Sequence, residues 1–234
     1  MGAIFKREFK AFFISPMGYI FLGIMAFFQG LGFSSVYVSG STDIGLVFEN
    51  MLTFVFVLIP VLTMRTMSED RKQKVDQVLL TSPVSLYSIV LGKFLATLSI
   101  FMLSYSLTVV FEIIIAFQNV TVNLLEYIGN ILGTALIGSA LIALGIFISS
   151  LTESQLVSAV CSFTATMFIY MLDLLAALVN KTKFTDFIDA ISFIGRYNTF
   201  TEGIIDYSNI VYFIMFGAVF IFLTVRVLDK RRYS

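Results

Sequence analysis

Several residue types are scarce or missing in this chain of 234 residues. It contains no histidine, which removes the commonest metal ligand and acid–base residue. Its one cysteine, Cys161, lies inside an apolar run and excludes an intramolecular disulfide. Tryptophan is also absent, so any aromatic belt at a membrane interface must be built from tyrosine.

Catalytic motifs are missing as well. No HExxH, CxxC or GxSxG pattern occurs. A phosphate-binding loop ending at Gly92-Lys93 would need a glycine five places earlier and Ser or Thr after the lysine, but those positions hold Tyr87 and Phe94. We therefore expect no enzyme activity, no metal site and no cofactor bound by this chain itself.

Apolar residues, by contrast, are abundant. The hydrophobic fraction is 58%, phenylalanine occurs 26 times, and the mean hydropathy is +0.95. A soluble domain of this length could not bury so much apolar surface, whereas repeated apolar runs of about 20 residues match the hydrocarbon core of a bilayer. We predict an all-α integral membrane protein, since a barrel would show short alternating strands instead. One transmembrane domain would cover residues 1–234, with spans near 17–38, 44–64, 92–117, 124–151, 156–179 and 209–228.

The N-terminal residues precede the first span. The apolar stretch that begins near Met17 is too long for a cleaved signal peptide, so we predict a retained span. Residues 2–14 alternate basic and apolar side chains in a way that fits an amphipathic helix in the membrane surface. A simple positive flank to the first span is the alternative. The residues concerned are Lys6, Arg7 and Lys10 against Ile4, Phe5, Phe9, Phe12 and Phe13.

The distribution of basic residues predicts the orientation. The formal net charge is zero, which argues against an acidic partner such as nucleic acid. With the N-terminus in the cytoplasm, only Lys181, Lys183 and Arg196 of the 15 Lys and Arg residues would lie outside. Cytoplasmic connections carry an excess of Lys and Arg. We therefore predict that both termini are cytoplasmic.

The segment SEDRKQKVDQVLLTSPVS (68–85) is unusually charged for this chain. Residues 66–80 contain no Gly or Pro, and Ser68 followed by Glu69 and Asp70 suits a helix start. We predict a cytoplasmic helix over 66–80, stopped before Pro83, and then a second short helix that re-enters the membrane. Its apolar side would dock on another protein. The alternative is a solvated loop whose charges only determine topology.

Other polar and small residues lie in or near the spans. Glu112 and Asp173 are candidates for lining a polar cavity that opens outward, or for hydrogen bonding to neighbouring helices. The fourth span carries Gly129, Gly133, Gly138 and Gly145, which favours close helix packing inside the bundle or against a second subunit. Residues 180–208 predict an outer amphipathic or re-entrant segment, with Phe184, Phe187, Ile188 and Ile191 at helical spacing.

Three stretches resemble the permeases of type-2 ABC exporters, especially the gliding-motility and nitrous-oxide-reductase-maturation branch. They are PVLTM (60–64) with the charges after it, LLTSPVSLYSIVLGKFLA (79–96) and FIGRYNTFTEGIIDYSNIVYF (193–213). The similarity runs over essentially the whole chain. One departure is at Lys74-Val75, where that branch usually has a Gly-Thr step.

This resemblance implies a permease subunit in a bacterial plasma membrane that couples cargo export to ATP hydrolysis. Its partners would be a cytoplasmic ATPase in two copies, which holds ATP-Mg, a second identical or homologous permease, and membrane lipids. The charged segment would be the coupling helix on the ATPase, and the N-terminal helix would brace it. Its contact residues would be Glu69, Asp70, Arg71, Lys72, Lys74, Val75, Val78 and Leu79. Gly203, Asp206 and Tyr207 would form an outer gate.

The main alternative is a membrane anchor subunit that ties an ATPase to a motility or assembly complex without transporting anything. An intramembrane enzyme lacks a suitable set of residues, and a channel would show rings of charge or a filter loop. No residue pattern identifies the cargo. The aromatic and mostly uncharged spans favour an amphipathic or hydrophobic molecule over a highly charged sugar polymer.

Overall fold

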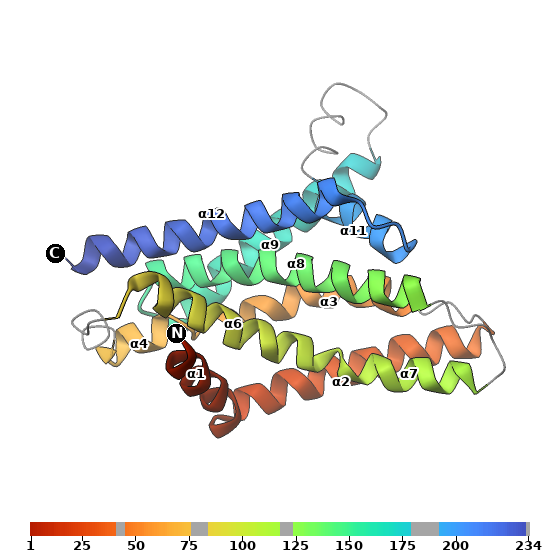
Figure 1. Cartoon of the computed structure of the whole chain (residues 1–234), viewed down its shortest axis with the longest axis horizontal. Helices are drawn as coiled ribbons and strands as arrows, with labels where there is room; N and C mark the ends of the chain where they lie inside the picture. Colours follow the sequence, from red (N-terminus) through yellow and green to blue (C-terminus); the bar gives the residue numbers. More distant parts are fainter. Residues whose placement is uncertain (41–44, 76–83, 118–123, 179–191, 233–234) are drawn as a thin grey trace.

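Helices account for the regular structure throughout the part of the chain that the computed structural model describes, residues 1–40, 45–75, 84–117, 124–178 and 192–232 (Figure 1). No strand occurs in these ranges. The helices are α1 (Gly2–Ile14), α2 (Pro16–Val38), α3 (Gly45–Thr63), α4 (Ser68–Lys72), α6 (Leu86–Ser104), α7 (Ser106–Ala116), α8 (Leu124–Leu151), α9 (Gln155–Leu178), α11 (Phe193–Thr201) and α12 (Tyr207–Arg232).

Six helical stretches in these ranges are long and apolar enough to cross a membrane, which confirms the predicted fold class. They cover Pro16–Val38, Gly45–Lys72, Leu86–Phe111, Leu125–Leu151, Gln155–Leu174 and Tyr207–Arg232. The prediction of a separate short helix before the third span is wrong. Instead α6 begins at Leu86, because the Ser85 hydroxyl accepts a hydrogen bond from the Ser88 backbone N–H and caps the helix directly.

The fourth span is the centre of the bundle. Helix α8 packs against α3, α6, α9, α11 and α12. A Cβ atom added at Gly138 would lie 2.2 Å from the ring of Phe101, and one added at Gly145 would lie 2.2 Å from Oγ1 of Thr63. These glycines let α6 and α3 approach α8 closely, in agreement with the expectation that they pack inside the bundle.

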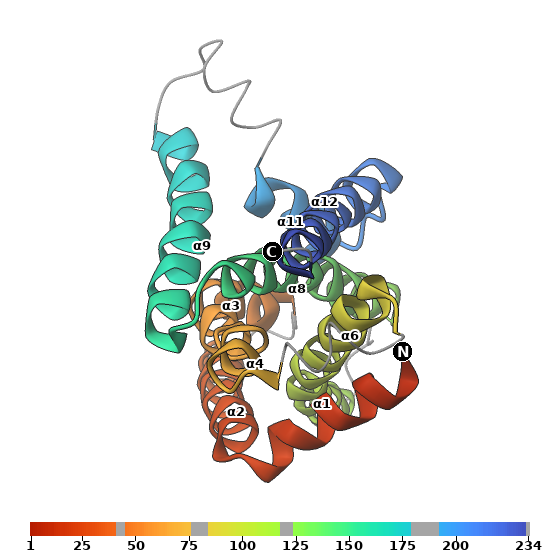
Figure 2. The ribbon, with the colours of Figure 1, turned by 90° about the vertical axis from the view of Figure 1, so that its left-hand side faces the viewer.

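Both ends of the chain lie at the same end of the bundle as α4 (Figure 1). We call this the charged end and define it by α1, α4, the first turns of α6 and the last turns of α12. Helix α1 runs across this end, joins α2 at Ser15 and packs on α6 (Figure 2). Phe12 of α1 is buried, while Lys6, Arg7 and Lys10 are exposed. A helix therefore forms over the predicted residues 2–14, and its place in a membrane surface stays a prediction.

Candidate functional site

Helix α4 is much shorter than the predicted helix over 66–80. It ends at Lys72, and Lys74 has a φ of +58°, which lies in the left-handed region. The prediction is therefore wrong at residues 73–74, although their side-chain types favour a helix. Contacts of the preceding residues with α1, α6 and α8 hold α4 in place, and these contacts outweigh the local preference. Residues 76–80, which include Val78 and Leu79, lie outside the described part of the chain.

The backbone conformation at Lys74 leads to a stability prediction. A left-handed residue with a Cβ atom costs about 1–2 kcal/mol, whereas glycine adopts this conformation without that cost. We expect Lys74→Gly to raise the apparent melting temperature of the purified protein by roughly 2–4 °C, since about 1 kcal/mol has this effect in a chain of this size. Differential scanning fluorimetry in detergent measures it. Lys74→Ala removes the same charge but keeps the Cβ atom, so an equal rise in both variants would contradict the explanation.

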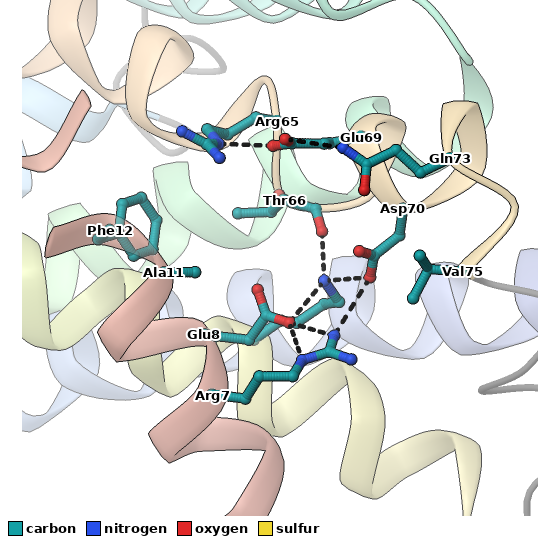
Figure 3. Close-up of a pocket in the computed structure, with 11 residues that line it drawn as sticks. Arg7, Glu8, Ala11, Phe12, Arg65, Thr66, Glu69, Asp70, Gln73 and Val75 are labelled. Atoms are coloured by element: carbon teal, nitrogen blue, oxygen red, sulfur yellow. Dashed lines mark hydrogen bonds and ion pairs between the residues drawn. The ribbon is translucent and has the colours of Figure 1, made fainter. Parts of the chain in front are cut away.

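The ammonium group of Lys93 lies at the charged end among Glu8, Thr66 and Asp70, which Figure 3 labels. Its side chain, which comes from α6, is only 2% exposed. Its Nζ atom lies 2.6 Å from the carbonyl oxygen of Thr66, 2.7 Å from Oδ2 of Asp70 and 3.1 Å from Oε1 of Glu8. A lysine ammonium has three protons to donate, and this site offers three oxygen atoms, one from α1 and two from the segment that leads into α4. Lys93 thus connects the third span to α1 and to the start of α4.

Arg7 completes this charge cluster, which we define as Arg7, Glu8, Asp70 and Lys93. Its guanidinium donates to the neighbouring Glu8 carboxylate, and its terminal nitrogen lies 3.5 Å from Oδ2 of Asp70. Burial lowers the pKa of Arg7, but the hydrogen bond to Glu8 and the charges of Glu8 and Asp70 outweigh burial, so the pKa is raised. The cluster is electrically neutral as a whole, which suits its position at the edge of the apolar bundle.

The remaining charges in α4 and in the residues beside it divide into an inward and an outward set. Arg65 pairs with Glu69 at 2.7 Å and donates to the hydroxyl of Ser15. Arg71 pairs with Glu153 at 2.7 Å, in the connection between α8 and α9. Three predicted contact residues, Glu69, Asp70 and Arg71, are therefore engaged within the chain. The outward set is Lys72 and Lys74, which are exposed, while Val75 is half-buried.

The end of α8 holds the backbone at the start of α4. The hydroxyl of Ser149 accepts hydrogen bonds from the backbone N–H groups of Met67 and Ser68 and donates to the carbonyl oxygen of Met64. Sequence reasoning missed Ser149, Glu8 and Lys93. Only Lys93 carried a usable signal, because a lysine inside an apolar span requires a buried acidic partner.

The other predicted site residues lie elsewhere. The Asp173 carboxylate accepts hydrogen bonds from the backbone N–H groups of Phe193 and Ile194 at 3.0 and 2.9 Å. This carboxylate satisfies donors at the beginning of α11, so Asp173 bonds to a neighbouring helix, as one of the two alternatives expected, with backbone N–H groups as its partners. Glu112 belongs to α7, and its side chain lies outside the described part of the structure. A cavity lined by these two acids stays a prediction.

Gly203 and Asp206 lie in the connection between α11 and α12, and Tyr207 is the first residue of α12. Gly203 has a φ of +75° and lies against Glu126 of α8. The Asp206 side chain accepts a hydrogen bond from the Ser208 backbone N–H at 2.8 Å, which caps α12. Tyr207 is 81% exposed. These three residues lie close together in sequence between the end of α11 and the first residue of α12, and their role as a gate stays a prediction.

Comparison with known proteins adds a family relationship. The family model described as "ABC-2 family transporter protein" matches residues 33–227 of the chain. This match covers four of the six spans completely and the last span as far as residue 227, together with α4 and Lys93, but it leaves out α1 and most of α2. A search of curated proteins finds no match.

Proposed function

The chain belongs to the ABC-2 transporter family, and from this premise we propose that it is the permease of an exporter whose separate ATPase subunits drive it through α4. Membership in the family supports a membrane-embedded permease subunit of an ABC transporter. We further propose two ATPase copies, which hold the ATP-Mg, and a second permease copy or homologue. A single six-span bundle would form one half of the translocation path.

The observation that carries this proposal is the attachment of α4 to three other helices. Lys93 ties α4 to α6, Arg7 ties it to α1, and Ser149 ties it to α8. A displacement of so short a helix therefore moves the ends of several helices together, because their contacts are ionic or hydrogen-bonded and mostly buried. Helix α4 has the attachments that a coupling element needs, and α1 would brace it from the side.

We propose that the charged end faces the cytoplasm of a bacterial cell. Lys230, Arg231 and Arg232 lie in the last turn of α12, and Lys6, Arg7 and Lys10 lie in α1 at the same end. Clustering of basic residues on one side of a membrane protein supports a cytoplasmic location. The ATPase would then meet the exposed side chains of Lys72 and Lys74, while the paired charges of α4 would keep the helix in position.

Site-specific cross-linking tests the ATPase contact. In a Cys161→Ser background, Lys72→Cys should form a cross-link to the co-expressed ATPase when a short bismaleimide is added, because Lys72 is exposed at the end of α4. Replacing Cys161 is necessary because this cysteine is itself exposed. The readout is a higher-mass band that antibodies against both subunits recognise.

The matched control is Asn50→Cys, an exposed position in the first turns of α3, toward the opposite end of the bundle. It should give no cross-link to the ATPase. Cross-linking from Asn50 but not from Lys72 would overturn the assignment of α4 and the orientation together. A separate measurement, the stimulation of ATP hydrolysis by cargo in liposomes, tests whether the assembled complex exports a substrate.

A further inference from the structure

Two hollows meet at the charged end, and they differ in chemical character. The first is a pocket of about 280 Å³, whose charged lining residues are Arg7, Glu8, Arg65, Glu69, Asp70 and Lys93 (Figure 3). The second is a narrow apolar crevice between α2 and α3, lined by Ile20, Ile24, Leu58 and Val61 among others. Phe12 and Arg65 line both. The charged pocket and the apolar crevice are therefore neighbours that share Phe12 and Arg65 as lining residues.

This combination matches the chemical character of a phospholipid, which joins a charged headgroup to apolar chains. The crevice is formed by the first turns of α2 and the last turns of α3, so it lies in the membrane leaflet nearest the charged end. Ile20 is 50% exposed and Val61 is 38% exposed, which leaves them available to an acyl chain. The charged pocket adjoins the crevice at Phe12 and Arg65, beyond the end of α3, where headgroups are expected.

Arg65 is the residue that would hold the phosphate. Its Nε atom donates to Glu69 and one terminal nitrogen donates to Ser15. A guanidinium has five N–H donors, and no further hydrogen bond from Arg65 is formed among the residues that the structure describes. The remaining donors can bind a phosphate oxygen while both existing contacts are kept.

The balance of charge in the pocket selects the type of headgroup. The basic side chains of Arg7, Arg65 and Lys93 are matched by the acidic ones of Glu8, Glu69 and Asp70. An anionic headgroup would add an uncompensated negative charge beside three carboxylates. A zwitterionic headgroup adds no net charge, and a primary ammonium could donate hydrogen bonds to the carboxylates while the phosphate meets Arg65.

We propose that the charged pocket and the crevice together bind one phospholipid with a primary-amine zwitterionic headgroup. The phosphate lies at Arg65, the ammonium lies toward Glu69 and Asp70, and one acyl chain follows the crevice between α2 and α3. The lipid would fill the angle where α1 joins α2, next to α4. This proposal concerns binding alone, so its test does not depend on transport or on the ATPase.

Native mass spectrometry of the full chain in detergent tests this site. The protein is titrated with palmitoyl-oleoyl phosphatidylethanolamine and, separately, with the phosphatidylcholine and phosphatidylglycerol of the same acyl chains. We expect one molecule of phosphatidylethanolamine to bind about tenfold more tightly than either of the others, as one or two charge-assisted hydrogen bonds would produce. Equal retention of the three lipids would mean ordinary annular lipid and would overturn the proposal.

Two variants locate the site. Val61→Trp fills the crevice from an exposed position, and Arg65→Gln removes the phosphate donor. Each should weaken phosphatidylethanolamine binding about tenfold or more. Val219→Trp on α12, where the side chain is 52% exposed, is the matched control and should leave binding unchanged. Because Arg65 also holds Ser15 and Glu69, Val61→Trp decides the matter if Arg65→Gln misfolds. Unchanged binding in Val61→Trp would overturn the proposal.

Discussion

Replacing Lys93 with methionine is expected to destabilise the protein by about 3 kcal/mol, because it removes one partner of a buried ionic contact. The carboxylates of Glu8 and Asp70, which are 14% and 19% exposed, would then face each other with only Arg7 to balance them. This partial exposure puts the cost at the lower end of the usual range for breaking a buried pair. The apparent melting temperature in detergent should fall by roughly 6–12 °C.

The same substitution should also disturb the coupling between the permease and its ATPase, since the ion pair of Lys93 with Asp70 joins α6 to α4. In the reconstituted complex with the ATPase, stimulation of ATP hydrolysis by the permease should be lost. The double variant Lys93→Met/Asp70→Leu replaces both partners with apolar side chains, leaves the Arg7–Glu8 pair intact and should recover most of the melting temperature.

The double variant separates the two roles of Lys93. If the ionic contact transmits movement of α4, stability should return without stimulation of the ATPase. Recovery of both properties would mean that Lys93 has a purely structural role. An unchanged melting temperature in Lys93→Met would contradict the buried charge cluster itself.

Gly145→Leu is expected to have the second large effect, because α8 and α3 are in contact at this position. The added Cβ atom would lie 2.2 Å from Oγ1 and 2.8 Å from Cβ of Thr63, which is fully buried. The two helices would have to separate, at a cost of about 1–3 kcal/mol or more. Thr63 is the last residue of α3, just before the segment that leads to α4. The variant should therefore lower the melting temperature and also reduce cross-linking of Lys72→Cys to the ATPase.

Gly23→Leu provides the matched control, since nothing lies within 4 Å of a Cβ atom built on Gly23. It introduces the same side chain into a transmembrane helix, but on a surface open to lipid. The free energy of unfolding of this variant should stay within about 0.5 kcal/mol of the parent's, and its melting temperature should therefore change little. Comparable losses in both variants would indicate a general intolerance of leucine for glycine rather than close packing of α3 and α8.

The six spans could be predicted from the sequence because a bilayer imposes a length and an apolar composition on each helix separately. The apolar run of Pro16–Val38, for example, shows its span without reference to any other part of the chain. Local signals were less reliable at the ends of helices. Ser85 moves the beginning of α6 to Leu86, before the predicted position 92, because a polar cap extends the helix past its apolar residues.

The charged site could be located from the sequence but its contacts could not. The run from Glu69 to Lys74 stands out by composition, which correctly marks the end of the second span. Charge alone does not show which side chains face inward. Asp70 and Arg71 pair with Lys93 and Glu153, which come from distant parts of the chain. Only folding brings these residues together.

The sequence by itself determined that this protein is a helical membrane protein with six spans, because hydrophobic length is a property of each segment alone. Tertiary structure decided the length of α4, the left-handed turn at Lys74 and the burial of the Lys93 ammonium among oxygen atoms of α1 and of the segment that leads into α4. The physical reason is that a buried charge is tolerated only where partners from elsewhere in the fold surround it.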